Sequence, residues 1–141
     1  MKFIVEIFLR KFLLSIGDAI MAVFTVSEHA LKASHEMIEE FDSFNRKNHT
    51  LNHIFIKVGI HNGPCIAVNL NDRVDYFGTS VNTAARIQGL PDGREIMVSE
   101  SFFNESLANK FLLDKNWKWD SFSTSLKGLK DNYKIFKLMK N

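Results

Sequence analysis

The sequence has little of three things: cysteine, net charge and uninterrupted hydrophobic runs. Cys65 is the single cysteine, so an internal disulfide is excluded and a reducing compartment, the cytoplasm, is indicated. The net charge of +2 is far from the basic excess of nucleic-acid-binding domains, so we expect no nucleic-acid partner. Glu6, Arg10 and Lys11 interrupt the apolar N-terminus, which argues against a signal peptide and a membrane-spanning segment in this chain.

The length and the hydrophobic content are those of a small globular protein. A chain of 141 residues falls within the usual size of one domain. A hydrophobic content of 45%, with 13 phenylalanines, supplies enough material for a core. We therefore expect one domain over residues 1–141.

Strand and helix patterns along the chain predict an α+β domain. Strand-like runs at residues 11–16 and 19–24 flank Gly17-Asp18 and predict a hairpin. Amphipathic helices are expected from about Ser27 to Lys47 and, between two glycines, over Thr79–Gln88. Further strands are expected at residues 53–61, 65–70, 95–99, 111–123 and 133–140, with a short helix over 100–107. This order predicts a largely antiparallel sheet that carries its helices on one face.

The second predicted helix carries a pair of polar residues with possible binding chemistry. Asn82 and Arg86 are four residues apart, so both side chains leave the same face of the helix. Together they could hold a sugar oxygen and a phosphate, because the planar guanidinium bonds two oxygens at once. On its own this pair is weak evidence, since many surface helices carry one by chance in contact with solvent.

Further motifs give the pair a context. In order, the chain contains GDA at residues 17–19, VGIHNGP at 58–64, DYFGTSVNTAARIQ at 75–88 and LKGL at 126–129. With these motifs the chain, from about Ile16 to the C-terminus, resembles the class III nucleotidyl cyclase catalytic domain, the adenylate and guanylate cyclase family. The resemblance implies a ferredoxin-like (palm-type) sandwich.

The resemblance also implies roles for five residues. Asp18 corresponds to the second of two aspartates that bind the catalytic Mg²⁺ or Mn²⁺ in the family. Asn82 corresponds to the residue that orients the ribose, Arg86 to the arginine that stabilises phosphate charge in the transition state, and Lys127 to the phosphate-contacting lysine. Asp75 corresponds to the aspartate that reads the purine amino group, which favours ATP over GTP. The alternatives are a plain turn residue for Asp18 and solvated side chains for Asp75 and Lys127.

The reaction implied is attack of the ribose 3′-hydroxyl on the α-phosphate, which converts ATP to cyclic AMP and pyrophosphate. In the family, metal ions activate the hydroxyl and neutralise phosphate charge. The family's site lies at a dimer interface, where one chain supplies the metal aspartates and the other the ribose and transition-state residues. The expected partners are therefore ATP, Mg²⁺ or Mn²⁺, and a second copy in a homodimer.

Two positions depart from the family pattern. The family opens with an F-x-D strand that carries the first metal aspartate and is followed by helices, but here Glu6 is the only acidic residue before Asp18. Leu14 occupies the position of the purine-reading lysine and cannot donate a hydrogen bond. We therefore expect an N-terminally truncated domain that lacks the usual first strand and helices, unless residues 2–9 supply a replacement, and that is impaired in catalysis. The alternative function is a non-catalytic module that dimerises or binds nucleotide.

Overall fold

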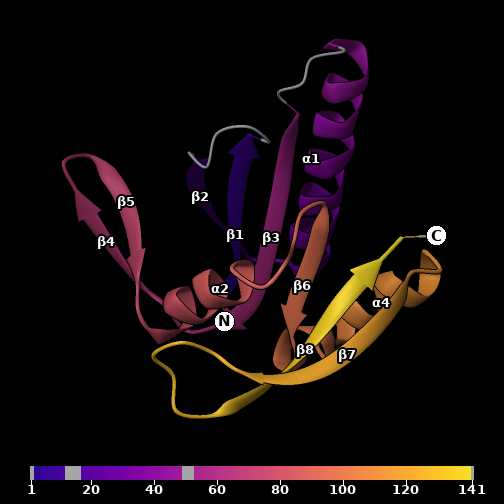
Figure 1. The fold of residues 1–141 in the computed structure, drawn as a ribbon. Helices are drawn as coiled ribbons and strands as arrows, with labels where there is room; N and C mark the ends of the chain where they lie inside the picture. The colour runs from indigo at the N-terminus through magenta and orange to yellow at the C-terminus, as the bar shows by residue number, and fades with distance from the viewer. Residues whose placement is uncertain (1, 12–16, 49–52, 141) are drawn as a thin grey trace.

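The structure, a computed structural model, describes residues 2–11, 17–48 and 53–140, with only the course of the backbone at 6–11 and 17–18. Its elements, in chain order, are β1 (Lys2–Lys11), β2 (Gly17–Phe24), α1 (Ser27–Asn48), β3 (Ile54–Gly63), β4 (Ile66–Leu70), β5 (Arg73–Phe77), α2 (Thr79–Gln88), β6 (Glu95–Ser99), α3 (Glu100–Phe103), α4 (Ser106–Asp114), β7 (Lys118–Ser125) and β8 (Asn132–Met139) (Figure 1). None of the helices among these described elements is long and apolar enough to cross a membrane.

The main sheet has the strand order β2-β1-β3-β6-β8-β7. Its neighbouring strands are antiparallel except for β3 and β6, which run parallel. Strands β4 and β5 form a separate antiparallel hairpin that stands away from this sheet (Figure 1). The largely antiparallel α+β fold predicted from the sequence is confirmed.

Strand β1 fills an interior position of the sheet. It pairs with β2 on one side and with β3 on the other, antiparallel to both. Phe3, Ile4 and Val5 are all buried, as a strand covered on both faces requires. The expectation of a sheet without its first strand is thus corrected, because the N-terminal residues supply one. The strand expected at 11–16 lies outside the described residues, apart from Lys11, which ends β1.

The helices cover both faces of the sheet. One core cluster packs residues of α1, α3 and α4 against β3, including Ala30, Leu31, Phe102, Leu112, Ile56 and Val58. A second cluster packs Ile87 of α2 against Met97, Leu126 and Ile135. Successive residues of β6, and likewise of β8, belong to different clusters. Because successive side chains of a strand point to opposite faces of the sheet, the two clusters lie on opposite faces, and α2 lies on the face opposite the other helices. The expectation of helices on one face is therefore corrected: β6 and β8 are apolar on both faces.

The two long helices agree with their predicted ranges, and two shorter elements differ from expectation. Residues 111–114 form the end of α4 rather than the start of a strand, because the Glu105 side chain accepts the backbone N–H of Ala108 (2.9 Å) and caps the helix. Strand β5 was not expected from the sequence. It follows a tight turn at Asn71 and Asp72, whose φ angles of 50° and 61° are those of a two-residue hairpin turn.

A partly buried chain of hydrogen bonds ties β3 to the junction of β6 and α3. Ser101 Oγ donates its only proton to Asn62 Oδ1 (2.7 Å), so Ser99 Oγ donates to Ser101 Oγ (3.1 Å). Ser99 Oγ also accepts the backbone N–H of Phe102 (3.3 Å), and His61 therefore donates Nδ1–H to Ser99 Oγ (2.8 Å). Burial lowers the pKa of His61 to about 4, so the neutral ring is the form that the fold holds.

We expect the free energy of unfolding to decrease as the pH is lowered from 6.5 to 4. Over this interval the unfolded chain binds a proton at His61 and the folded chain does not, so protonation favours unfolding. The contribution is about 3 kcal/mol. Urea unfolding at a series of pH values should show a shallower pH dependence in His61→Asn than in the unmodified chain. The matched control, His29→Asn at an exposed position of α1, should keep the original slope. Equal slopes for all three proteins would contradict this assignment.

Candidate functional site

Helix α2 lies against β3 at two glycines. A Cβ placed at Gly59 would overlap the backbone nitrogen of Gln88 and lie 2.8 Å from the carbonyl oxygen of Ala84. A Cβ placed at Gly63 would overlap Oγ of Ser80 and lie 3.0 Å from its Cβ. At both ends of the helix the approach to β3 is therefore so close that the strand has room only for a glycine. This close packing sets the depth of α2 on the sheet.

The opposite side of α2 carries the predicted polar pair. Ser80, Thr83, Ala84 and Ile87 are the buried residues of the helix. Asn82 and Arg86 are exposed, one turn apart. The prediction that these two residues share the accessible face of one helix agrees with the described structure.

Arg86 and Lys127 line one open cavity of about 330 Å³. Arg86 comes from α2 and Lys127 from the connection between β7 and β8, and the other lining residues are Ala85, Gly89, Leu90, Ser125 and Leu126. Buried Leu126 packs in the same cluster as Ile87 and so holds this connection against the helix. None of the ion pairs formed by the described residues involves either cation. Both charges are therefore available to an anion.

Asp75 is separated from this cavity. It lies in β5, opposite Val68 of β4, and its Oδ1 accepts the backbone N–H of Tyr76 (3.1 Å). The side chain is exposed and does not line the Arg86–Lys127 cavity. The structure thus brings together Arg86 and Lys127, places Asn82 on the same helix, and leaves Asp75 on the hairpin.

Asp18 is the second residue of β2. The backbone register places it opposite Leu9 of β1, and places Gly17 opposite Arg10. Glu6 lies opposite Met21, roughly 10 Å along the strand from the position facing Asp18. Leu14, the other departure from the family pattern, lies outside the described residues.

The carboxylates whose side chains the structure describes, which do not include Glu6 and Asp18, form no site for a pair of metal ions. No group of three or more His, Cys, Asp or Glu residues comes together among these described side chains to hold a metal. Mg²⁺ and Mn²⁺ take oxygen ligands, and the residue opposite Asp18 is Leu9 rather than a second carboxylate.

The arrangement suits the binding of a polyphosphate. The guanidinium of Arg86 offers a planar fork to two oxygens, and the ammonium of Lys127 offers a point charge across the same cavity. Sequence reasoning identified both cations but missed Gly59 and Gly63, which position the helix. The two glycines are four residues apart, so both lie on one face of the strand. This spacing could have indicated from the sequence that a helix packs closely on that face.

We expect the two glycines to respond differently to a change on the helix. Gly59→Ala and Gly63→Ala should each lower the free energy of unfolding, by about 1–3 kcal/mol, because each added methyl group overlaps α2. Ser80→Gly removes the obstacle to Gly63→Ala, so this pair should show positive coupling in a double-mutant cycle measured by urea unfolding. The obstacle to Gly59→Ala is backbone, so Gly59→Ala with Ser80→Gly is the matched control and should be additive. Additivity in both cycles would contradict this packing.

Residues 11–140 match the family described as the adenylate and guanylate cyclase catalytic domain. The chain is 31% identical over 99 residues to an adenylate cyclase of Mycosarcoma maydis and 27% identical over 100 residues to guanylate cyclase 32E of Drosophila melanogaster. These matches cover 64% and 63% of this chain. They cover only 4% and 9% of the two relatives, so the chain spans a small part of their length.

Solved structures of cyclases share the fold. The guanylyl cyclase Cya2 gives a TM-score of 0.77 at 18% identity, with 97% of this chain and 90% of that chain covered. An adenylate/guanylate cyclase/hydrolase from Silicibacter pomeroyi gives 0.74 at 15% identity, with 99% and 96% covered. The guanylate cyclase domain of RhGC from Catenaria anguillulae, solved with GTP, gives 0.73 at 17% identity, with 99% and 97% covered. At these identities the likeness establishes the architecture.

Proposed function

The chain belongs to the adenylate and guanylate cyclase catalytic domain family, and we propose that it binds a nucleoside triphosphate at the Arg86–Lys127 cavity as part of a cyclase site. The proposed reaction is conversion of ATP to cyclic AMP and pyrophosphate, in the cytoplasm, with residues 1–141 acting as one domain. The observation that carries the proposal is the meeting of these two cations from distant parts of the chain, neither of which forms an ion pair with another described residue.

Each proposed role is the one that the family resemblance implies, and the chemistry of each side chain suits it. Arg86 stabilises the negative charge that develops on the α-phosphate when the ribose 3′-hydroxyl attacks it, and Lys127 holds the phosphate oxygens. Asn82 lies one turn before Arg86 and orients the ribose by accepting and donating hydrogen bonds. Asp75 accepts a hydrogen bond from the adenine amino group, which favours ATP over GTP.

The family generally uses divalent metal ions; Asp18 is the metal ligand that we propose in this chain, and a complete set of ligands requires a partner chain that carries both metal aspartates. The backbone register places Leu9, not a second carboxylate, opposite Asp18, so this chain contributes the nucleotide-holding half of a site more completely than the metal-holding half. A homodimer of this chain then binds ATP but is impaired in turnover. A dimer with a domain that carries both metal aspartates contains one complete site, with Mg²⁺ or Mn²⁺ held by the partner.

Dimer formation is supported by the β4–β5 hairpin. Ile66, Leu70, Val74 and Phe77 are 66%, 49%, 60% and 46% exposed, although all four are large and apolar. They are concentrated on two strands that stand apart from the main sheet (Figure 1). A two-stranded hairpin of this kind is marginally stable without a partner surface. In a two-fold symmetric dimer, each copy supplies a partner surface to the hairpin of the other.

We expect Ile66→Glu with Leu70→Glu to convert the dimer to a monomer, because both changes put charge on one face of the exposed hairpin. Sedimentation velocity at tens of micromolar measures the result. Leu113→Glu is the matched control: it changes a leucine of α4 that is 60% exposed and should leave the dimer intact. A chain that is monomeric before any substitution, or a hairpin variant that stays dimeric, would contradict the proposed interface.

We expect the chain to complement a helper domain in a cyclase assay with Mn²⁺-ATP. The helper is a complete cyclase domain of the family with its arginine corresponding to Arg86 replaced by alanine, so that its homodimer is inactive but keeps both metal aspartates. Mixing should produce cyclic AMP, and Arg86→Ala in this chain should lower that activity about 100-fold or more.

Lys130→Ala is the matched control for charge, because Lys130 is exposed near Lys127 but does not line the cavity. It should complement as well as the unmodified chain. Full activity of this chain without the helper would contradict the half-site assignment. ATP binding, measured by calorimetry and lost in Arg86→Ala, without complementation would favour the non-catalytic nucleotide-binding module.

A further inference from the structure

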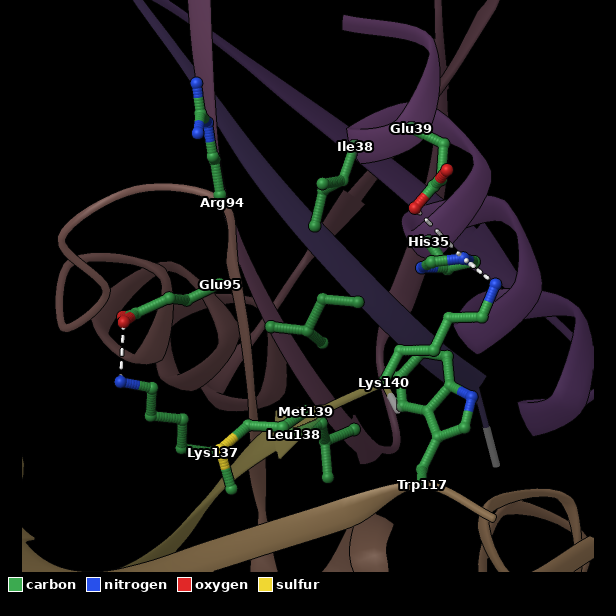
Figure 2. Close-up of a pocket in the computed structure, with 11 residues that line it drawn as sticks. His35, Ile38, Glu39, Arg94, Glu95, Trp117, Lys137, Leu138, Met139 and Lys140 are labelled. Atoms are coloured by element: carbon green, nitrogen blue, oxygen red, sulfur yellow. Dashed lines mark hydrogen bonds and ion pairs between the residues drawn. The ribbon is translucent and has the colours of Figure 1, made fainter. Parts of the chain in front are cut away.

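Two further cavities lie on the sheet face opposite α2. The smaller, of about 220 Å³, lies between α1 and the ends of β6 and β8 (Figure 2). The larger, of about 310 Å³, lies between α1 and α4. His35, Trp117 and Lys140 line both cavities and form their shared wall. Small-ligand sites begin at about the size of the larger cavity.

Trp117 places an unpaired hydrogen-bond donor at this wall. Trp117 is only 6% exposed, and its ring packs edge-on against the rings of His35 and Phe111. The distances between ring centroids are 5.2 Å and 6.1 Å, respectively. No hydrogen bond from its indole N–H is found among the described residues. Yet no fully buried side-chain nitrogen or oxygen there lacks a partner, so this N–H must reach open space. Since Trp117 lines both cavities, a ligand bound there can accept this hydrogen bond in place of solvent water.

The rim of the larger cavity has one more cation than anion. It carries Lys32, Lys115 and Lys140 against Glu28 and Glu36. The ion pairs of the described residues involve none of the three lysines. An excess of one positive charge favours a ligand with a single negative charge, since a dianion would also meet two carboxylates.

Lys140 is held in place by a neutral group. Its ammonium donates to Nε2 of His35 (3.0 Å), which can accept only while the ring is uncharged (Figure 2). Burial and then the charge of Lys140 lower the pKa of His35, while Glu39 and Glu36 oppose the shift.

We propose that these cavities bind a small monocarboxylate with an aromatic or apolar body. The carboxylate accepts hydrogen bonds from the Lys140 ammonium and the Trp117 indole N–H. The body packs on Phe111 in the larger cavity, or on Ile38 and Leu138 in the smaller one. The sheet separates this site from Arg86, so its occupation is independent of the proposed nucleotide site and can be measured without turnover.

The test uses 2-naphthoate as the probe and the indole N–H signals of the full chain in ¹H–¹⁵N spectra. The sequence has two tryptophans, and Trp119 lines neither cavity, so its signal is an internal control. Trp119→Phe assigns the two signals. We expect a saturable shift of the Trp117 signal and an unmoved Trp119 signal. Lys140→Gln should raise the dissociation constant about tenfold, because one charge-assisted hydrogen bond is lost.

Two further ligands and a matched variant test the charge argument. Neutral 2-naphthamide and dianionic 2-naphthyl phosphate should both bind more weakly than 2-naphthoate. Lys110→Gln, which changes an exposed lysine of α4 outside both cavities, should leave the dissociation constant unchanged. The proposal is overturned by the absence of a saturable Trp117 shift, by equal binding of the amide, by tighter binding of the phosphate, or by unchanged affinity in Lys140→Gln.

Discussion

The packing of α2 on β3 is the contact on which the candidate site depends. At Gly59 the strand meets helix backbone directly, and at Gly63 it meets the short side chain of Ser80. This depth brings Ile87 into the cluster that also contains Leu126. The two cations of the site are then held from both sides, one on the helix and one beside Leu126. The lack of side chains at Gly59 and Gly63 thus helps to set the positions of Arg86 and Lys127.

Local patterns in the sequence predicted α1 and α2 well, but not the extent of α4. Apolar spacing and flanking glycines gave α2 its full range, and the four-residue spacing of Asn82 and Arg86 gave their common face. The proximity of Arg86 to Lys127 was implied only through the family resemblance. It depends on packing between α2 and the connection of two distant strands, which no local pattern encodes. The roles of these residues in binding stay predictions.

The differences from expectation have physical causes that act over a distance or leave little trace in the sequence. The interior position of β1 is decided by its pairing with β2 and β3 on its two sides, not by its own charged residues. The helix at Ser106 is set by the capping side chain of Glu105, while the apolar run that follows is equally typical of a strand. Glycine has no apolar side chain, so the sequence of β3 does not indicate that the face carrying Gly59 and Gly63 is covered by a helix.

The β4–β5 hairpin has a consequence for substrate choice. It carries the exposed apolar residues assigned to dimer contact and, on the same two short strands, Asp75, assigned to the purine base. A residue on an arm that is shaped by its neighbour cannot discriminate between bases before the neighbour arrives. With the proposed dimer contact and the proposed role of Asp75, selectivity for ATP over GTP would depend on protein concentration, because the surface that supports the hairpin is completed only in the dimer.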